Sequence, residues 1–143
     1  MEVTKFIWDE KYSVGLSSLD KQHKRFFEIG NNLIDLAEKP EPTHNELLSM
    51  IKELEDYAFY HLKTEEELFE KFQYPESQTH IEAHEQYRDK VKHYLAIVSA
   101  ESPSSDLRKL AEEIASYSIY WLTNHILIMD KEYTAFFLEH GVK

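Results

Sequence analysis

Histidine and carboxylate side chains stand at helical spacing at several points of this sequence. Two pairs are four residues apart and three more positions stand singly, which gives a set of seven: His23, His61, Glu65, His80, His84, His125 and Asp130. Residues four apart lie on one face of a helix, so both members of a pair can reach a common centre. Imidazole nitrogen and carboxylate oxygen together suit iron, manganese or zinc. The pattern therefore predicts a metal site and leaves the choice among these metals open.

A purely structural role for the seven side chains is the main alternative. A single buried histidine is commonly a core residue with one hydrogen bond. Seven such groups in one core are different, because an unpaired buried carboxylate costs several kcal/mol and an unsatisfied imidazole about 1–3 kcal/mol. The total stability of a domain is only about 5–15 kcal/mol. Cations would neutralise the carboxylates and accept the nitrogens, so the sequence favours a metal site.

Two familiar helical metal motifs fit this pattern less well. In the HxxxH motif of zinc proteases a glutamate follows the first histidine, whereas Ile81 follows His80 here. A ferritin-like di-iron site takes two Glu-x-x-His strings on helices. The one such string, from Glu41 to His44, lies in a proline-containing turn. The seven residues thus point to a different kind of centre.

Four long amphipathic segments have to position these residues. Apolar residues recur at three- and four-residue steps, which predicts four helices, over about residues 18–39, 43–72, 77–99 and 105–140. Thr43 and Glu46 form a capping box, and Ser104 or Ser105 is the expected N-cap of the last helix. Short connections make successive helices antiparallel, so we expect one all-α domain: an up-down-up-down antiparallel four-helix bundle with residues 1–17 as an N-terminal arm. All seven candidate ligands then meet at one end of the core.

The spacing between the last two candidate ligands predicts an irregular helix. His125 and Asp130 are five residues apart, so on a regular helix they would point about 140° from each other. A single π-type turn would aim both side chains at one centre, and such turns are frequent at functional sites.

Composition excludes several classes of site and partner. Because none of the 143 residues is cysteine, disulfides, iron–sulfur clusters, thiolate zinc sites and cysteine nucleophiles are ruled out. The formal net charge of −11 argues against nucleic acid, which requires a basic face. The first residues lack the pattern of an export signal, and no stretch approaches the ~20 apolar residues of a membrane span. We therefore expect a cytoplasmic protein with no membrane partner.

The ligand positions resemble those of the hemerythrin family, in particular the single-domain bacterial hemerythrins. The order of the seven residues matches the full ligand set of that family. The resemblance runs from about Ile7 to Phe137 and includes further stretches: Trp8-Asp9, Val14-Gly15, Leu19-Asp20-x-Gln22-His23, Tyr74-Pro75 and Trp121-Leu122-x-Asn124-His125-Ile126.

This resemblance implies two iron ions, Fe2+ or Fe3+, with a bridging oxide or hydroxide. One iron would be held by His80, His84 and His125, the other by His23 and His61, with Glu65 and Asp130 bridging. Two six-coordinate metals take twelve ligand bonds, of which five histidines, two bridging carboxylates and the bridging oxygen supply eleven. The open position would lie on the iron with two histidines. Dioxygen is the expected ligand there, and small anions such as azide, or nitric oxide, are further candidates.

Residues around the ligands have expected roles of their own. Apolar side chains would line the oxygen pocket: Phe26 or Phe27 from the first helix, with Trp121, Leu122 and Ile126 beside His125. The three remaining histidines, His44, His93 and His140, are expected in solvent, and Glu66 and Glu67 should be surface charges.

Three functions are compatible with such a centre. The first is reversible oxygen binding for carriage, storage or delivery, without catalysis. The second is a sensing module in which oxygen or nitric oxide changes helix packing for a protein partner that the sequence does not identify. The third is a di-iron enzyme that reduces peroxide, oxygen or nitric oxide. Oxygen binding is favoured, because no additional acid, base or nucleophile appears in the pocket sequence.

Overall fold

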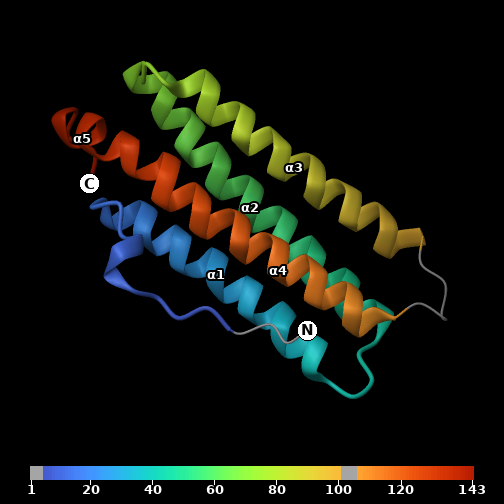
Figure 1. The fold of residues 1–143 in the computed structure, drawn as a ribbon. Helices are drawn as coiled ribbons and strands as arrows, with labels where there is room; N and C mark the ends of the chain where they lie inside the picture. Colours follow the sequence, from blue (N-terminus) through green and yellow to red (C-terminus); the bar gives the residue numbers. More distant parts are fainter. Residues whose placement is uncertain (1–4, 101–105) are drawn as a thin grey trace.

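Four long helices make up most of the chain, as expected for an all-α bundle (Figure 1). The structure is a computed structural model and describes residues 5–100 and 106–143. Its helices are α1 (Ser17–Glu38), α2 (His44–Phe72), α3 (Ser77–Ala100), α4 (Leu107–His125) and α5 (Lys131–Glu139), together with a short 3-10 turn, η1 (Glu10–Tyr12), and a π-helical segment, η2 (Ile126–Asp130). The last predicted helix is therefore one continuous helical run with a π segment inside it.

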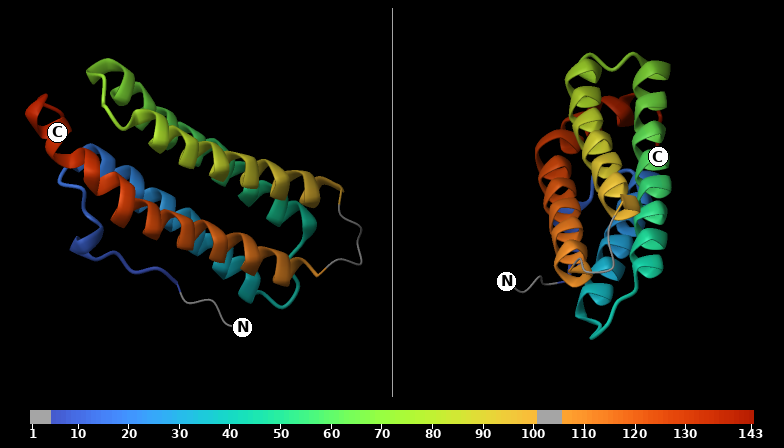
Figure 2. Two further views of the ribbon diagram at one scale, coloured as in Figure 1. Left: turned by 45° about the horizontal axis from the view of Figure 1, so that its top comes forward. Right: turned by 90° about the vertical axis from the view of Figure 1, so that its right-hand side faces the viewer.

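The helices alternate in direction, and α1 packs against α2 and α4 while α2 packs against α3. Two further views show the helices side by side in this antiparallel arrangement (Figure 2). The start of α1, the end of α2, the start of α3 and the end of α4 consequently share one end of the molecule. In the described part of the chain, no helix is long and apolar enough to cross a membrane.

Local hydrogen bonds set where the helices begin. Thr43 and Glu46 form the predicted capping box at α2, with the Glu46 amide donating to Thr43 Oγ1 at 3.1 Å and the Thr43 amide donating to Glu46 Oε1 at 3.0 Å. At α4 the cap is Asp106, whose Oδ1 accepts from the Lys109 amide at 3.1 Å. The predicted cap at residues 104–105 lies outside the described residues.

The N-terminal arm packs on the outside of α1. The ring of Phe6 stacks on Phe27 with centroids 3.5 Å apart, and Asn31 exchanges two hydrogen bonds with the Phe6 backbone at 2.8 and 2.9 Å. Asp20 holds the end of the arm by accepting from the Val14 amide at 2.9 Å. The arm thereby covers the outward side of Phe27.

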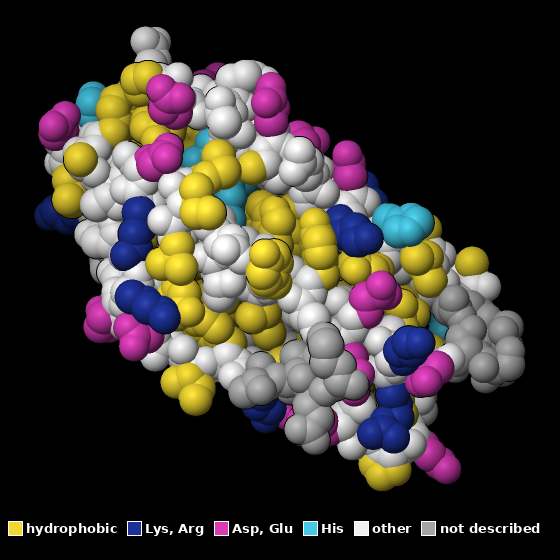
Figure 3. Space-filling view, viewed as in Figure 1, with side chains coloured by type: hydrophobic (Ala, Val, Ile, Leu, Met, Phe, Trp, Pro, Cys, Tyr) yellow, Lys and Arg dark blue, Asp and Glu magenta, His cyan; other side chains and the backbone are white. Residues whose placement is uncertain are grey.

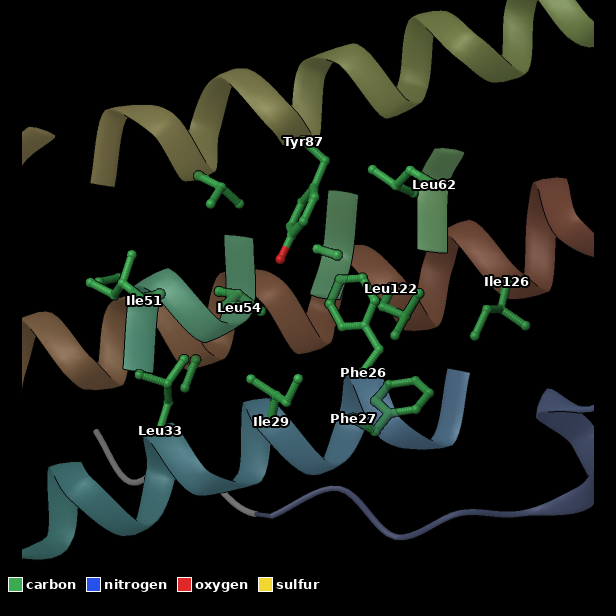
Figure 4. Packing of buried hydrophobic residues seen from close by; sticks show 14 of the residues in the cluster. Phe26, Phe27, Ile29, Leu33, Ile51, Leu54, Leu62, Tyr87, Leu122 and Ile126 are labelled. Carbon is green, nitrogen blue, oxygen red and sulfur yellow. The ribbon is translucent and has the colours of Figure 1, made fainter. Parts of the chain in front are cut away.

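The contact between α1 and α4 and the contact between α3 and α4 are filled by side chains of different size. Gly30 allows close approach of α1 and α4, because a Cβ there would lie 2.9 Å from Ile119 Cγ1. Between α3 and α4 the gap is bridged by aromatic rings, with Tyr87 and Trp121 stacked at 4.4 Å. Figure 4 shows Tyr87 entering the core opposite the apolar residues of α1 and α2.

Candidate metal centre

The seven predicted ligands meet in the core at one end of the bundle. Six of them are at most 1% exposed and His125 is 6% exposed. Their donor atoms form two overlapping groups in which all atoms lie within 4.8 Å of one another. One group contains Glu65, His80, His84, His125 and Asp130, and the other contains His23, His61, Glu65 and Asp130. The structure thus brings together all seven residues that the sequence singled out.

Three histidines converge in the first group. The Nε2 atom of His125 lies 2.8 Å from that of His80 and 3.2 Å from that of His84. Asp130 Oδ1 adds an oxygen at 2.9 Å from His80 Nε2 and 3.0 Å from His125 Nε2. A six-coordinate cation with bonds of about 2.1 Å places neighbouring ligand atoms about 3 Å apart. This spacing therefore fits the ligand shell of one metal ion.

The two carboxylates extend between both groups. Glu65 directs Oε1 toward His84 Nε2 at 3.2 Å and Oε2 toward His61 Nε2 at 3.6 Å. Asp130 directs Oδ1 to the three-histidine group and Oδ2 toward His23 Nε2 at 3.1 Å. Each carboxylate therefore has one oxygen on each side, which is the arrangement that two bridging ligands require.

Several of these atoms lack hydrogen-bond partners. Among the described residues, buried atoms without one include His23 Nε2, His61 Nε2, Glu65 Oε1 and both carboxylate oxygens of Asp130. They lie within ion-pairing distance of one another but outside hydrogen-bond alignment. Buried polar atoms are ordinarily hydrogen-bonded, so a cluster of exceptions requires another partner. Metal cations are a partner that suits both the nitrogens and the oxygens.

Two histidines are oriented by polar side chains from neighbouring helices. His61 Nδ1 lies 2.7 Å from Gln22 Oε1, and His84 Nδ1 lies 2.7 Å from Glu66 Oε2. Because these oxygens accept the Nδ1 protons, both Nε2 atoms face the centre as possible metal ligands. Arg88 in turn donates two hydrogen bonds to Glu66, at 2.8 and 3.0 Å.

The expectation that Glu66 is only a surface charge was wrong. Its side chain is 21% exposed and binds His84 and Arg88, because it lies on the flank of α2 that faces α3. Its neighbour Glu67 is exposed, as predicted.

Tyr133 is a buried polar residue that sequence reasoning missed. Its hydroxyl donates to Glu65 Oε2 at 2.5 Å, and its ring stacks on His80 with centroids 5.7 Å apart. Burial, followed by the charges of Asp130 and Glu65, raises the pKa of Tyr133 well above its usual value. The phenol therefore keeps its proton and remains a donor. Its position three residues after Asp130 on the same helical run was the available signal.

The predicted π turn is present. Residues Ile126 to Asp130 form η2, between α4 and α5. This widening brings Asp130 Oδ1 to 3.0 Å from His125 Nε2, although the two residues are five positions apart. The helix therefore departs from regular geometry where two candidate ligands have to reach one centre.

The three remaining histidines lie outside the cluster. His93 and His140 are exposed, as expected. His44 was also expected in solvent, but it is half-buried and its Nε2 lies 2.5 Å from the Val98 carbonyl oxygen. It therefore links the start of α2 to the end of α3, a contact that depends on how the helices pair.

The predicted lining residues occupy different surroundings. Leu122 and Ile126 are fully buried, and Figure 4 shows them near Phe26, whose ring is edge-on to His61 at 6.2 Å. Phe27 packs with aromatic residues of the arm. Trp121 stacks on His125 with centroids 4.4 Å apart, so it lies beside the three-histidine group.

Comparison with known proteins agrees with this geometry. Residues 14–137 match the family described as Hemerythrin HHE cation binding domain. The chain belongs to the hemerythrin family. This confirms the resemblance that the ligand order suggested.

Individual hemerythrin relatives cover most of this chain. The Bacteriohemerythrin of Clostridium acetobutylicum is 26% identical over 130 residues, spanning 90% of this chain and 98% of the relative. That of Pseudomonas aeruginosa strain LESB58 is 31% identical over 128 residues, spanning 89% and 78%. A Hemerythrin-like protein of Naegleria gruberi is 30% identical over 128 residues, spanning 90% of each chain. A crystal structure of wild-type hemerythrin has the same fold, with a TM-score of 0.81 at 23% identity over 92% of this chain and 97% of that one.

Protonation of the cluster makes metal binding depend on pH. Burial lowers the pKa of His61 to about 3, so its ring is neutral. Burial also opposes charge on His23, but the neighbouring carboxylates of Asp130 and Glu65 raise its pKa to about 9. For His84, the carboxylates of Glu65 and Glu66 overcome the effect of burial and likewise raise the pKa to about 9. A metal has to displace the protons from these two rings below pH 9.

We therefore expect a divalent metal ion to release about two protons per chain at pH 7, with affinity that increases as the pH is raised toward 9. Metal-stripped protein in weak buffer, titrated with Zn2+ in the presence of a pH indicator, measures this release. Release should disappear above about pH 10, where both rings are already neutral. Zero release at pH 7 would show that His23 and His84 are unprotonated there.

Proposed function

We propose that this hemerythrin holds two iron ions and binds dioxygen reversibly. His80, His84 and His125 would hold one iron, His23 and His61 the other, and Glu65 and Asp130 would bridge them together with an oxide or hydroxide. The observation that carries this assignment is the pair of overlapping donor groups that share both carboxylates. Five imidazoles with two bridging carboxylates are a donor set that suits iron.

The two donor groups contain different numbers of histidines, and this difference supports oxygen binding on the side of His23 and His61. The three-histidine group has one more nitrogen than the group formed by His23 and His61. If the bridging atoms contribute equally to both irons, the iron held by His23 and His61 would have one protein ligand fewer and could accept an added ligand. If two ferrous ions were held by these residues, they would supply the electrons needed for reversible oxygen binding.

Apolar residues on this side would protect the bound ligand. Leu122 and Ile126 are fully buried and Phe26 is 2% exposed, so water has little access from that direction. An uncharged lining admits a neutral diatomic molecule more readily than it admits water or an anion. Tyr133 has its hydroxyl on Glu65 and holds its proton there, so it is not available as a general base.

Anaerobic reduction of the iron-loaded protein, followed by exposure to oxygen, tests the function. Reversible binding predicts a ligand-to-iron absorption band that forms with oxygen and disappears under vacuum over repeated cycles. Continuous oxygen consumption in the presence of a reductant would instead indicate an enzyme. Azide provides a second probe, and in a crystal it should bind the iron held by His23 and His61.

Metal content tests the ligand assignment. We expect about two irons per chain after expression in iron-replete cells. His84→Ala should weaken binding of its iron at least about 100-fold and lower the stability of the loaded protein by about 3–5 kcal/mol, because charged neighbours remain buried without compensation. Atomic absorption and denaturant unfolding measure the two effects. His93→Ala is the matched control, since His93 is exposed, and equal losses in both variants would refute the assignment.

The lining can be tested separately from the ligands. Leu122→Ala should leave the iron content at the wild-type value, because Leu122 offers no donor atom. It should accelerate loss of the oxygen complex about 10-fold or more by admitting water. Decay of the oxygen band at constant temperature measures the rate. Leu138→Ala, at an exposed leucine, should decay as the wild type does.

A further inference from the structure

A groove on the surface of the bundle reaches one residue of the metal centre from the side of α3 and α4. Its volume is about 270 Å3, and its lining consists of Ala83, Tyr117, Tyr120, Trp121, Asn124, His125, Ile128 and Met129. Figure 3 shows hydrophobic side chains gathered over this face, with histidine visible among them. The groove is distinct from the apolar pocket assigned to oxygen, because Trp121 and His125 border it whereas Leu122, Ile126 and Phe26 do not.

The lining is unusual for the surface of this chain. The chain has a formal net charge of −11, yet no lining residue carries a charged carboxylate, ammonium or guanidinium group. Tyr120 and Ile128 are 70% and 63% exposed, and the adjacent Leu127 is 41% exposed. Concave apolar areas of this kind mark binding sites more often than isolated exposed hydrophobic residues do.

Stacked rings hold the base of the groove in place. Trp121 stacks on His125 at 4.4 Å with an interplanar angle of 12°, and on Tyr87 at 4.4 Å and 26°. Tyr87 stacks in turn on Tyr117 at 6.0 Å and 2°, and donates to Ser118 Oγ at 2.8 Å. The indole therefore has little freedom to swing into the groove and close it. The groove is preformed, as sites for small molecules usually are.

The shape and chemistry of the lining restrict the occupant. A charged ligand would lose its hydration without gaining a counter-charge, so an uncharged ligand is favoured. Three aromatic side chains favour a planar molecule. The Asn124 amide adds a polar group at the edge, where its Nδ2 already donates to the Tyr120 carbonyl oxygen at 2.9 Å. The volume is slightly below the range of about 300–1,000 Å3 for drug-sized ligands, which corresponds to one or two fused rings.

We propose that this groove binds an uncharged planar molecule of one or two rings, of the quinone or phenol class. The ligand lies against Trp121 and touches the exposed edge of His125, the most accessible of the clustered histidines. That the bound molecule contacts a metal ligand, His125, rests on the proposed function. Binding of the molecule in the groove does not depend on the proposed function.

Equilibrium dialysis of the purified protein with 1,4-naphthoquinone, and separately with 2-naphthol, tests the proposal. We expect one molecule per chain with a Kd of about 0.1–1 mM. The chain has no cysteine, so a quinone cannot be captured by a thiol. Binding of the quinone but not of the phenol would assign the site to quinones, and binding of both would assign it to planar uncharged rings in general.

Two variants place the ligand in the groove. Ile128→Glu adds a charge to its edge and should weaken binding at least about 10-fold. Ala83→Phe fills the groove from α3 and should do the same. Leu138→Glu makes the same kind of change at a residue that is 52% exposed and outside the groove, and should bind as the wild type does. Iron content, measured in parallel, should be equal in all three, which separates this proposal from the metal assignment.

Three results would overturn the proposal. These are no binding of either probe, equal binding by the wild type and Ile128→Glu, and equal weakening by Leu138→Glu. Sedimentation of the wild type and of Ile128→Glu measures the oligomeric state, and so tests whether a second copy of the chain occupies the groove instead. A wild-type dimer that Ile128→Glu dissociates, together with no binding of the probes, would show that the groove joins two copies of the chain.

Discussion

Two carboxylates buried in a helical core are the constraint on which the rest of this structure depends. Glu65 and Asp130 are both 0% exposed, and burial together with their mutual repulsion opposes ionisation. The surrounding histidines nevertheless hold the pKa of each carboxyl well below its usual value. A core of this kind is stable only when positive charge lies between the two groups. That requirement explains why imidazoles from four helices converge at one level of the bundle, and it is met most completely by metal ions.

The residues that orient the candidate ligands also join the helices. Gln22 precedes the candidate ligand His23 on α1 but binds His61 on α2. Glu66 follows the candidate ligand Glu65 on α2 but binds His84 on α3. Successive residues on a helix point about 100° apart, so when one faces the core its neighbour faces an adjacent helix. Helix pairing and ligand geometry therefore rest on the same hydrogen bonds, and a small shift of one helix would disturb both.

Periodicity predicted the helices well, because long amphipathic repeats separated by proline turns have few alternative folds. The sequence also predicted the π segment, because the five-residue spacing of His125 and Asp130 does not fit a regular α-helical turn. It could not assign Glu66, His44 or Tyr133, whose roles depend on which helix lies beside each flank. An apolar stripe separates inside from outside, but it does not identify the neighbour of a half-buried polar residue. The same limit applies to Trp121, which stacks on His125 and borders the surface groove, whereas its neighbour Leu122 is fully buried.

The two sides of the candidate metal centre differ in their accessibility to ligands of different size. Around His23 and His61 the neighbouring apolar side chains are buried, so only a very small neutral molecule could reach that side without moving the core. Around His125 the aromatic seam between α3 and α4 leaves a groove large enough for a ring, with Trp121 in stacking contact with the histidine. The interface between α3 and α4 is wide because large aromatic rings fill it. By contrast, Gly30 allows α1 and α4 to approach closely. The size of the residues at the α1–α4 and α3–α4 interfaces thus determines which side of the candidate centre is closed and which is accessible from the surface.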